Sequence, residues 1–136
     1  MNELLQVITA TTVAETPVIL VGDFNSAPED APFESAFGLG TLYPPYLQAV
    51  GTGYNDLWLS KKKPKDGFTC CFAPDVSDED AELYSRIDHI FIDPKAREIA
   101  KLKAKVVGDS NADMTDISGL NPSDHAGVFG KIKLEK

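Results

Sequence analysis

Two polar positions just past an apolar run could do chemistry together. Asp23 and Asn25 lie two residues apart, directly after the run at 18–21. Because residues two positions apart point the same way in an extended backbone, a carboxylate and an amide would project side by side from a strand end. An aspartate can orient or deprotonate water, and an asparagine amide can donate to a phosphoryl oxygen. A simple Asx turn is the alternative interpretation of this pair.

A second carboxylate, Asp88, stands inside the apolar segment 86–92. A charged group there is costly unless it is paired or hydrogen-bonded. Arg86 precedes it by two residues, so strand alternation predicts that both lie on one face, where they could pair. His89 would point to the opposite face, and we interpret it as a packed or surface histidine.

The other histidine of the chain lies in a loop. His125 directly follows Asp124 and precedes the last apolar segment. An Asp–His pair in a loop is compatible with an ordinary surface turn as well as with catalysis. Since these polar groups precede or follow predicted strands, they can converge on a common edge of one layered sheet, where open α/β sheets place ligands.

Composition narrows the class of protein. The 136 residues fit one domain, and the composition is typical of a soluble globular chain with a formal net charge of −8. No apolar run approaches the roughly 20 residues of a membrane helix, and the start lacks the pattern of a signal peptide. The acidic charge disfavours broad nonspecific binding to nucleic acid.

Two clusters could suggest other functions. The lysines within 61–65 could contact phosphate or act as a localisation signal, but a solvated turn is the simpler interpretation. Cys70 and Cys71 are adjacent, and on a strand they would point to opposite faces. They miss the usual zinc spacing, and a vicinal disulfide is strained, so we expect one thiol in the core and one outside it.

The elements that must position these side chains mix helices and strands. The run at 18–21 is typical of a strand buried on both faces, and a helix is expected before it, which favours an α/β layered fold. The patterns predict helices over 3–15 and 31–38, a loop-rich stretch over 39–67, and strands over 68–72, 86–92, 97–108 and 127–134.

Three motifs, taken in order, resemble one family. They are PVILVGDFNSAPED (17–30), SRIDHIFI (85–92) and NPSDHAGVFGKIKL (121–134), with GFTCC (67–71) before the second. Their order and separation are similar to those of the carboxy-terminal half of the endonuclease/exonuclease/phosphatase superfamily, which has the DNase I-like fold. The resemblance implies a metal-dependent phosphodiesterase, phosphatase or nuclease. Its substrate would be a phospholipid, a small phosphoester or a nucleic acid.

The resemblance also implies a role for each matching residue. Asp23 would orient and activate the attacking water, and Asn25 would donate a hydrogen bond to the phosphate. Asp88 would hold His125 in the right tautomer and orientation, and His125 would bind the phosphate or assist proton transfer. Asp124 would lie near a divalent cation, Mg²⁺ or alternatively Mn²⁺ or Ca²⁺, because hard cations prefer oxygen ligands.

The chain is shorter than the domain of this family. The first half of that domain carries the glutamate that is the principal metal ligand, and no segment here resembles it. We therefore expect a partial domain over 1–136 that supplies mainly one sheet of the two-sheet sandwich and its helices. Metal binding is expected to be weak, and we expect weak or no activity from the chain alone. A signal peptide would lie upstream, so the location stays open.

A non-catalytic half-domain is the alternative function. The inner face of the remaining sheet would expose apolar side chains, and a large exposed apolar patch drives association. Such a half-domain would bind the missing amino-terminal half, another partner, or a second copy of the chain.

Overall fold

The computed structural model describes residues 1–13, 16–60, 65–78, 81–95 and 99–134. Most of the lysine cluster, 61–64, lies outside the described residues. The elements, in chain order, are α1 (Asn2–Thr11), β1 (Ile19–Asp23), β2 (Phe33–Glu34), β3 (Thr41–Leu42), α2 (Pro45–Gly51), β4 (Asn55–Asp56), β5 (Asp88–Ile92), β6 (Ile99–Val107), a 3₁₀ turn η1 (Asn111–Asp113) and β7 (Gly127–Leu134).

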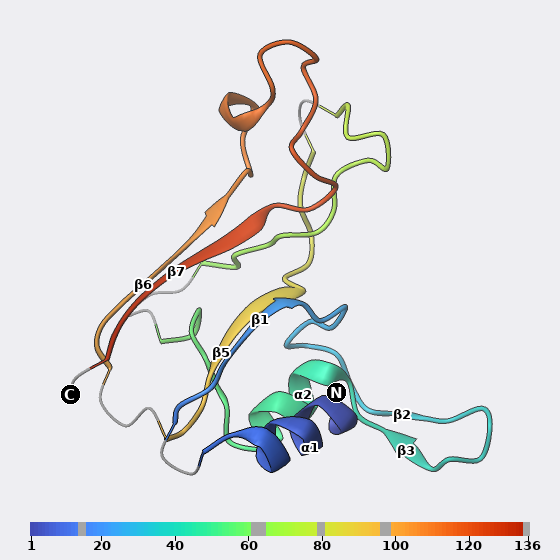
Figure 1. Cartoon of the computed structure of the whole chain (residues 1–136). Coiled ribbons are helices and arrows are strands. Elements are labelled where there is room, and N and C mark those ends of the chain that lie inside the picture. The colour runs from blue at the N-terminus through green and yellow to red at the C-terminus, as the bar shows by residue number, and fades with distance from the viewer. Residues whose placement is uncertain (14–15, 61–64, 79–80, 96–98, 135–136) are drawn as a thin grey trace.

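The central sheet has the strand order β1-β5-β4, with both pairs antiparallel. Its register places Leu20 opposite Phe91, and both side chains point toward the helices. There they pack with Tyr46 and Ala49 of α2, while partly buried residues of α1 complete the cluster. The sheet and the two helices therefore share one apolar core, and Figure 1 shows α1 and α2 lying side by side below β1 and β5.

The opposite face of β5 meets a second sheet, the antiparallel hairpin β6-β7. A Cβ placed on Gly130 would lie 2.6 Å from a methyl carbon of Leu57 and 2.7 Å from one of Ile90. A larger residue would push these two methyl groups aside, so Gly130 lets β7 pack directly on the sheet. The result is three layers: helices, a three-stranded sheet, and a hairpin above it (Figure 1).

The α/β class predicted from the sequence is confirmed. Two helices and small antiparallel sheets form a partial DNase I-like α/β fold. The predicted strands at 86–92, 97–108 and 127–134 correspond to β5, β6 and β7. In the described part of the chain, none of the helices has the length and apolar character needed to cross a membrane.

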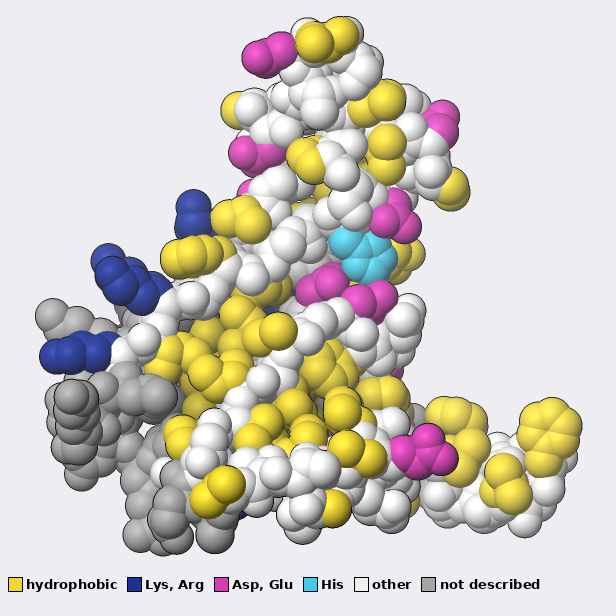
Figure 2. All heavy atoms as spheres, viewed as in Figure 1, with side chains coloured by type: hydrophobic (Ala, Val, Ile, Leu, Met, Phe, Trp, Pro, Cys, Tyr) yellow, Lys and Arg dark blue, Asp and Glu magenta, His cyan; other side chains and the backbone are white. Residues whose placement is uncertain are grey.

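Strand β1 is not buried on both faces as predicted. Leu20 is buried, but Ile19 is 42% exposed and Val21 is 67% exposed. These two point away from the helices, toward the side of the sheet on which the β6-β7 hairpin packs. Yellow apolar side chains are accordingly visible on this face in Figure 2. The apolar run at 18–21 correctly predicted a strand, but it did not show which face of that strand is buried.

Three other predicted elements differ from the structure. Instead of a helix, 31–38 contains the first strand of the β2-β3 hairpin, whose turn uses Gly38 and Gly40 at positive φ. The loop-rich stretch contains helix α2, which starts with a proline at its first position. In 68–72 only Cys70 forms strand-like bridges, to Ser85 and His125.

Lysines gather on the outer face of the β6-β7 hairpin. Register pairing sets Lys103 opposite Lys131 and Lys105 opposite Phe129, and these residues are exposed. Dark-blue side chains project from this part of the molecule in Figure 2. Strand alternation thus builds a basic face that the sequence analysis, which considered the lysines within 61–65, did not predict.

Candidate functional site

The first part of the site is the turn that follows β1. The backbone N–H of Asn25 donates to Oδ1 of Asp23 at 2.7 Å, and its side-chain Nδ2 donates to Oδ2 at 3.1 Å. Asn25 has φ of 46°, a conformation that asparagine tolerates better than most residues. The pair is therefore an Asx turn, and both side chains remain exposed. Because an amide has two N–H donors, Asn25 keeps one for a ligand.

The second part is a hydrogen bond between Asp88 in β5 and His125 in the loop that precedes β7. Nδ1 of His125 lies 3.0 Å from Oδ2 of Asp88, and the two side chains are 21% and 19% exposed. A carboxylate accepts, so Nδ1 carries the proton in this bond, and Nε2 faces Sγ of Cys71 at 3.9 Å. Asp88 thus has the partner that its place in an apolar strand requires, and this partner is His125 rather than Arg86.

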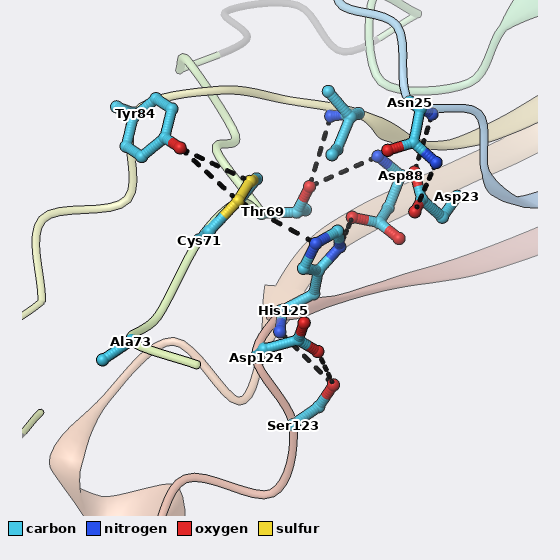
Figure 3. Close-up of a disulfide and its surroundings, with 12 residues drawn as sticks. Asp23, Asn25, Thr69, Cys71, Ala73, Tyr84, Asp88, Ser123, Asp124 and His125 are labelled. Carbon is cyan, nitrogen blue, oxygen red and sulfur yellow. Dashed lines mark hydrogen bonds and ion pairs between the residues drawn. A yellow bond between two sulfur atoms is a disulfide. The ribbon is translucent and has the colours of Figure 1, made fainter. Parts of the chain in front are cut away.

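Register brings the two parts together. Asp23 pairs with Asp88 at the end of the β1-β5 ladder. Asp23, Asp88 and His125 each offer a ligand atom within 4.8 Å of the others. Figure 3 shows these three side chains and Asn25 converging at the strand ends. The sequence-predicted group Asp23, Asn25, Asp88 and His125 therefore lies at one place, open to solvent.

Asp124 differs from the other predicted residues. Its carboxylate is exposed and accepts a hydrogen bond from Ser123 Oγ at 3.1 Å. Among the described residues, it does not belong to the group formed by Asp23, Asp88 and His125. It lies on the rim beside His125 (Figure 3), where its backbone carbonyl accepts from the N–H of Phe72.

One buried residue that sequence analysis missed holds the segments of the site together. Thr69 is fully buried, and its Oγ1 accepts from the backbone N–H groups of Ile87 and Asp88, each at 3.3 Å. Its carbonyl accepts from the N–H of Ala126 at 2.8 Å. Thr69 therefore ties β5 to the loop of His125. The only signal for it was its place in the GFTCC motif.

A buried polar network lies behind the Asp23–Asn25 turn. His89 is 2% exposed, with Nε2 2.8 Å from the carbonyl oxygen of Ser26 and Nδ1 2.9 Å from Nη1 of Arg86. Arg86 in turn pairs with Asp56 at 2.7 Å, and that carboxylate also accepts from the Tyr46 hydroxyl. The network fixes Ser26, the neighbour of Asn25.

The electrostatics of this network follow from burial. Desolvation is the largest cause that lowers the pKa of His89 below its ordinary value of 6.5. The same effect, followed by the negative charge of Asp56, raises the pKa of Tyr46 to about 12. His89 is thus a neutral packed histidine, as one of its two sequence interpretations predicted. The neighbouring guanidinium of Arg86 donates to Nδ1, and Nε2–H donates to Ser26.

The predicted pairing of Arg86 with Asp88 is wrong. β5 begins at Asp88, so strict strand alternation does not extend back to Arg86. The guanidinium turns to the helix side, where Asp56 gives a buried partner with 2% side-chain exposure. Asp56 lies in the stretch that looked loop-rich, and its short strand could not be recognised from a periodic pattern.

The cysteine prediction is also corrected. Cys70 is buried and Cys71 is partly buried, but they are joined in a vicinal disulfide rather than left as separate thiols. Only Cys70 makes strand-like bridges, so the backbone here is not a regular strand that would send the two side chains to opposite faces. Sγ of Cys71 lies 3.9 Å from Nε2 of His125, at the edge of the candidate site.

The comparisons with known proteins agree with the motifs. A model of the endonuclease/exonuclease/phosphatase family matches residues 1–125, a range that includes all five candidate site residues with the last, His125, at its end. The chain belongs to the endonuclease/exonuclease/phosphatase family, whose members act on phosphoesters. Neither the curated proteins nor the solved structures gave a match.

The donor atoms of the site fit the cation that the family uses. The family is generally dependent on divalent metals. Asp23 and Asp88 provide carboxylate oxygens and His125 a ring nitrogen, all within 4.8 Å. Carboxylate oxygens suit Mg²⁺ and Mn²⁺, and solvent exposure leaves room for the waters that Mg²⁺ keeps.

Proposed function

We propose that this chain carries the reaction centre of a metal-dependent phosphoester hydrolase. The observation behind the proposal is the convergence of Asp23, Asn25, Asp88 and His125 at the ends of paired strands. The family supports the reaction class, and the side chains supply the groups that such a reaction needs: a base, hydrogen-bond donors and an oriented histidine.

Each side chain has a proposed task. Asp23, held by two hydrogen bonds from Asn25, orients the attacking water and accepts its proton. The remaining Nδ2–H of Asn25 donates to a phosphoryl oxygen as negative charge grows there. Asp88 holds the ring of His125 through Nδ1, so that Nε2 faces the phosphate; when the ring carries a proton on both nitrogens, Nε2–H can donate it to the phosphate or to the leaving oxygen.

A bound Mg²⁺ would neutralise phosphate charge, with Asp23 and Asp88 as the residues that hold it and Asp124 as a carboxylate nearby. In the described residues, no glutamate joins this group. We therefore propose weak metal binding and slow turnover for the chain by itself, as a carboxy-terminal portion of the family domain. A further carboxylate from another segment would strengthen both.

The substrate we propose is a small phosphoester or a phospholipid headgroup ahead of a nucleic acid. The net charge of −8 repels a polyanion, although the lysine face of β6-β7 is locally basic. Binding of a small phosphate group depends less on that overall charge than binding of a nucleic acid does.

The test is hydrolysis of bis-p-nitrophenyl phosphate by the purified chain with Mg²⁺ or Mn²⁺. We expect slow, metal-dependent release of nitrophenol that Asp23→Ala and His125→Ala each reduce by about 100-fold or to background. Ser77→Ala is a matched control on an exposed loop, and it should leave the rate unchanged.

Metal binding is measured on the same samples by the loss of the free Mn²⁺ signal in electron paramagnetic resonance. We expect weak binding that Asp23→Ala abolishes. Hydrolysis that survives both site substitutions would contradict the proposal, as would a chain that neither turns over substrate nor binds Mn²⁺.

A second function rests on a different observation. Ile19 and Val21 expose apolar side chains on the sheet face opposite the helices. We propose, as the alternative, a non-catalytic half-domain that uses this face to bind a partner segment or a second copy. Light scattering after size-exclusion chromatography tests self-association: a mass that rises with concentration and returns to monomer in Val21→Lys supports it, whereas a monomer at all concentrations counts against it.

A further inference from the structure

His125 belongs to a second group of potential ligands besides the acidic one. Cys70, Cys71 and His125 each offer a ligand atom, and these atoms all lie within 4.8 Å of one another. Figure 3 shows the two sulfurs next to the imidazole, on the side of the ring away from Asp88. This group, which we call the Cys–Cys–His group, offers sulfur and nitrogen where the other offers mainly oxygen.

The orientation of His125 suits a metal ligand. Its Nδ1 donates to Asp88 Oδ2 at 3.0 Å, which leaves the Nε2 lone pair facing Cys71 Sγ at 3.9 Å. Histidines that bind metals commonly donate their other ring N–H to a carboxylate, which fixes the tautomer and makes the free nitrogen more basic. Asp88 gives His125 this arrangement toward the sulfurs.

The surrounding backbone holds the group in place before any ligand arrives. Cys70 forms strand-like bridges to both Ser85 and His125. The adjacent Thr69 accepts from the N–H of Ala126, on the other side of His125. The hydroxyl of Tyr84 lies 3.6 Å from Sγ of Cys71 and 3.9 Å from Sγ of Cys70. These contacts hold the segments of Cys70, Tyr84 and His125 next to one another.

We propose that, once the disulfide is reduced, Cys70, Cys71 and His125 bind a thiophilic divalent cation such as Zn²⁺. Two thiolates and one imidazole are a donor set that zinc favours, and they leave its fourth position for water. A phosphine reductant and one water convert the disulfide into two thiols and a phosphine oxide. The cation then displaces the two thiol protons. The disulfide form lacks these thiolates and does not bind.

When a cation binds to the Cys–Cys–His group, His125 is no longer available to the group that it forms with Asp23 and Asp88. The same Nε2 that would face a phosphate becomes a ligand of the thiophilic cation, so the two groups cannot both use it. The binding claim stands without the proposed hydrolysis, because it concerns affinity for a cation and not turnover.

Cobalt is the probe, because thiolate ligands give bound Co²⁺ an intense charge-transfer absorption in the near ultraviolet. We expect the phosphine-reduced chain to bind one Co²⁺ with this absorption and Zn²⁺ to displace it. The oxidised chain should show no such band. Cys71→Ser should weaken Co²⁺ binding by about tenfold or more and reduce the band. The matched control Asp23→Asn, in the oxygen-rich group, should leave the band unchanged.

Blocking the reduced thiols of the wild-type chain with N-ethylmaleimide gives a second measurement that needs no variant to fold. It should abolish the band. The proposal is overturned if reduced chain fails to bind Co²⁺, if binding occurs without the thiolate band, or if Cys71→Ser and the blocked chain bind as the wild type does.

Discussion

The two faces of β5 show how one strand serves two purposes. On the helix side, His89 and Phe91 are 2% and 0% exposed and belong to the core. On the other side, Asp88 reaches solvent at the end of the strand and Ile90 packs under Gly130. Adjacent residues therefore enter opposite environments, and only the second face carries groups that a ligand can reach.

The two histidines differ in the same way, and the difference lies in the partners of their ring nitrogens. Both ring nitrogens of His89 are occupied within the protein, by Ser26 and Arg86. His125 uses Nδ1 for Asp88, and its Nε2 faces the sulfur of Cys71 at 3.9 Å, a weak contact. A histidine that holds its neighbours in place has no free nitrogen, whereas one suited to chemistry keeps one.

The largest difference between the faces should appear on removing apolar volume. Phe91→Ala deletes a fully buried ring that meets Phe24 edge-on and packs with Tyr46, so we expect a loss of about 4 kcal/mol in the free energy of unfolding. Val21→Thr, on the exposed side, should change it by no more than about 0.5 kcal/mol. Urea denaturation followed by circular dichroism measures both, and equal losses would break the comparison.

Removing a carboxylate charge should have the next largest effect, and it should destabilise the chain more on the helix side of β5 than on the other side. Asp56→Asn leaves Arg86 buried without its carboxylate, and we expect a loss of about 3 kcal/mol in unfolding free energy. Asp88→Asn disturbs a partly exposed pair and should cost about 1 kcal/mol or less. The same denaturation series tests this. A larger cost at Asp88 than at Asp56 would show that the site, not the network behind it, stabilises the sheet.

The approach of β7 to the sheet can be tested at one glycine. A valine at Gly130 would overlap Leu57 and Ile90, so we expect Gly130→Val to lower the free energy of unfolding by about 2 kcal/mol. Gly51→Ala is a suitable control because its added Cβ meets nothing within 4 Å and its φ is not positive. Thermal unfolding of both variants should show a clear decrease only for the first.

The sequence predicted much of the site because its residues lie at strand ends. Asp23 and Asp88 follow or begin strongly apolar strands, and strand register then brings them together. The grouping with His125 came from the order of family motifs. Thr69 could not be predicted as an organising residue, because a buried threonine has no distinctive spacing and its role depends on three distant backbone groups.

The secondary-structure elements that the sequence did not predict share a physical cause: each is too short to show a periodic pattern. β2, β3 and β4 have two residues each, and helix α2 has seven. Tertiary contacts decide such segments. The exposed side of β1 failed for a related reason, because an apolar run predicts a strand but its pattern does not say what covers each face.

The smallest effect we expect is a pH dependence that belongs to the helix face alone. Burial lowers the pKa of His89, so the folded chain keeps this ring neutral at a pH where the unfolded chain already binds a proton. The free energy of unfolding should therefore fall as the pH drops below about 6.5, and the loss should grow until the pH reaches the lowered pKa. In His89→Gln, which retains a donor and an acceptor but does not titrate, this part of the loss is absent. Urea midpoints at pH 7.5 and 5.5 give the difference, in which the carboxylates and His125, common to both chains, cancel. If the stability of the wild type and of His89→Gln changed equally with pH, His89 would be solvated in the folded chain. The two histidines would then not differ as a buried and an accessible ring.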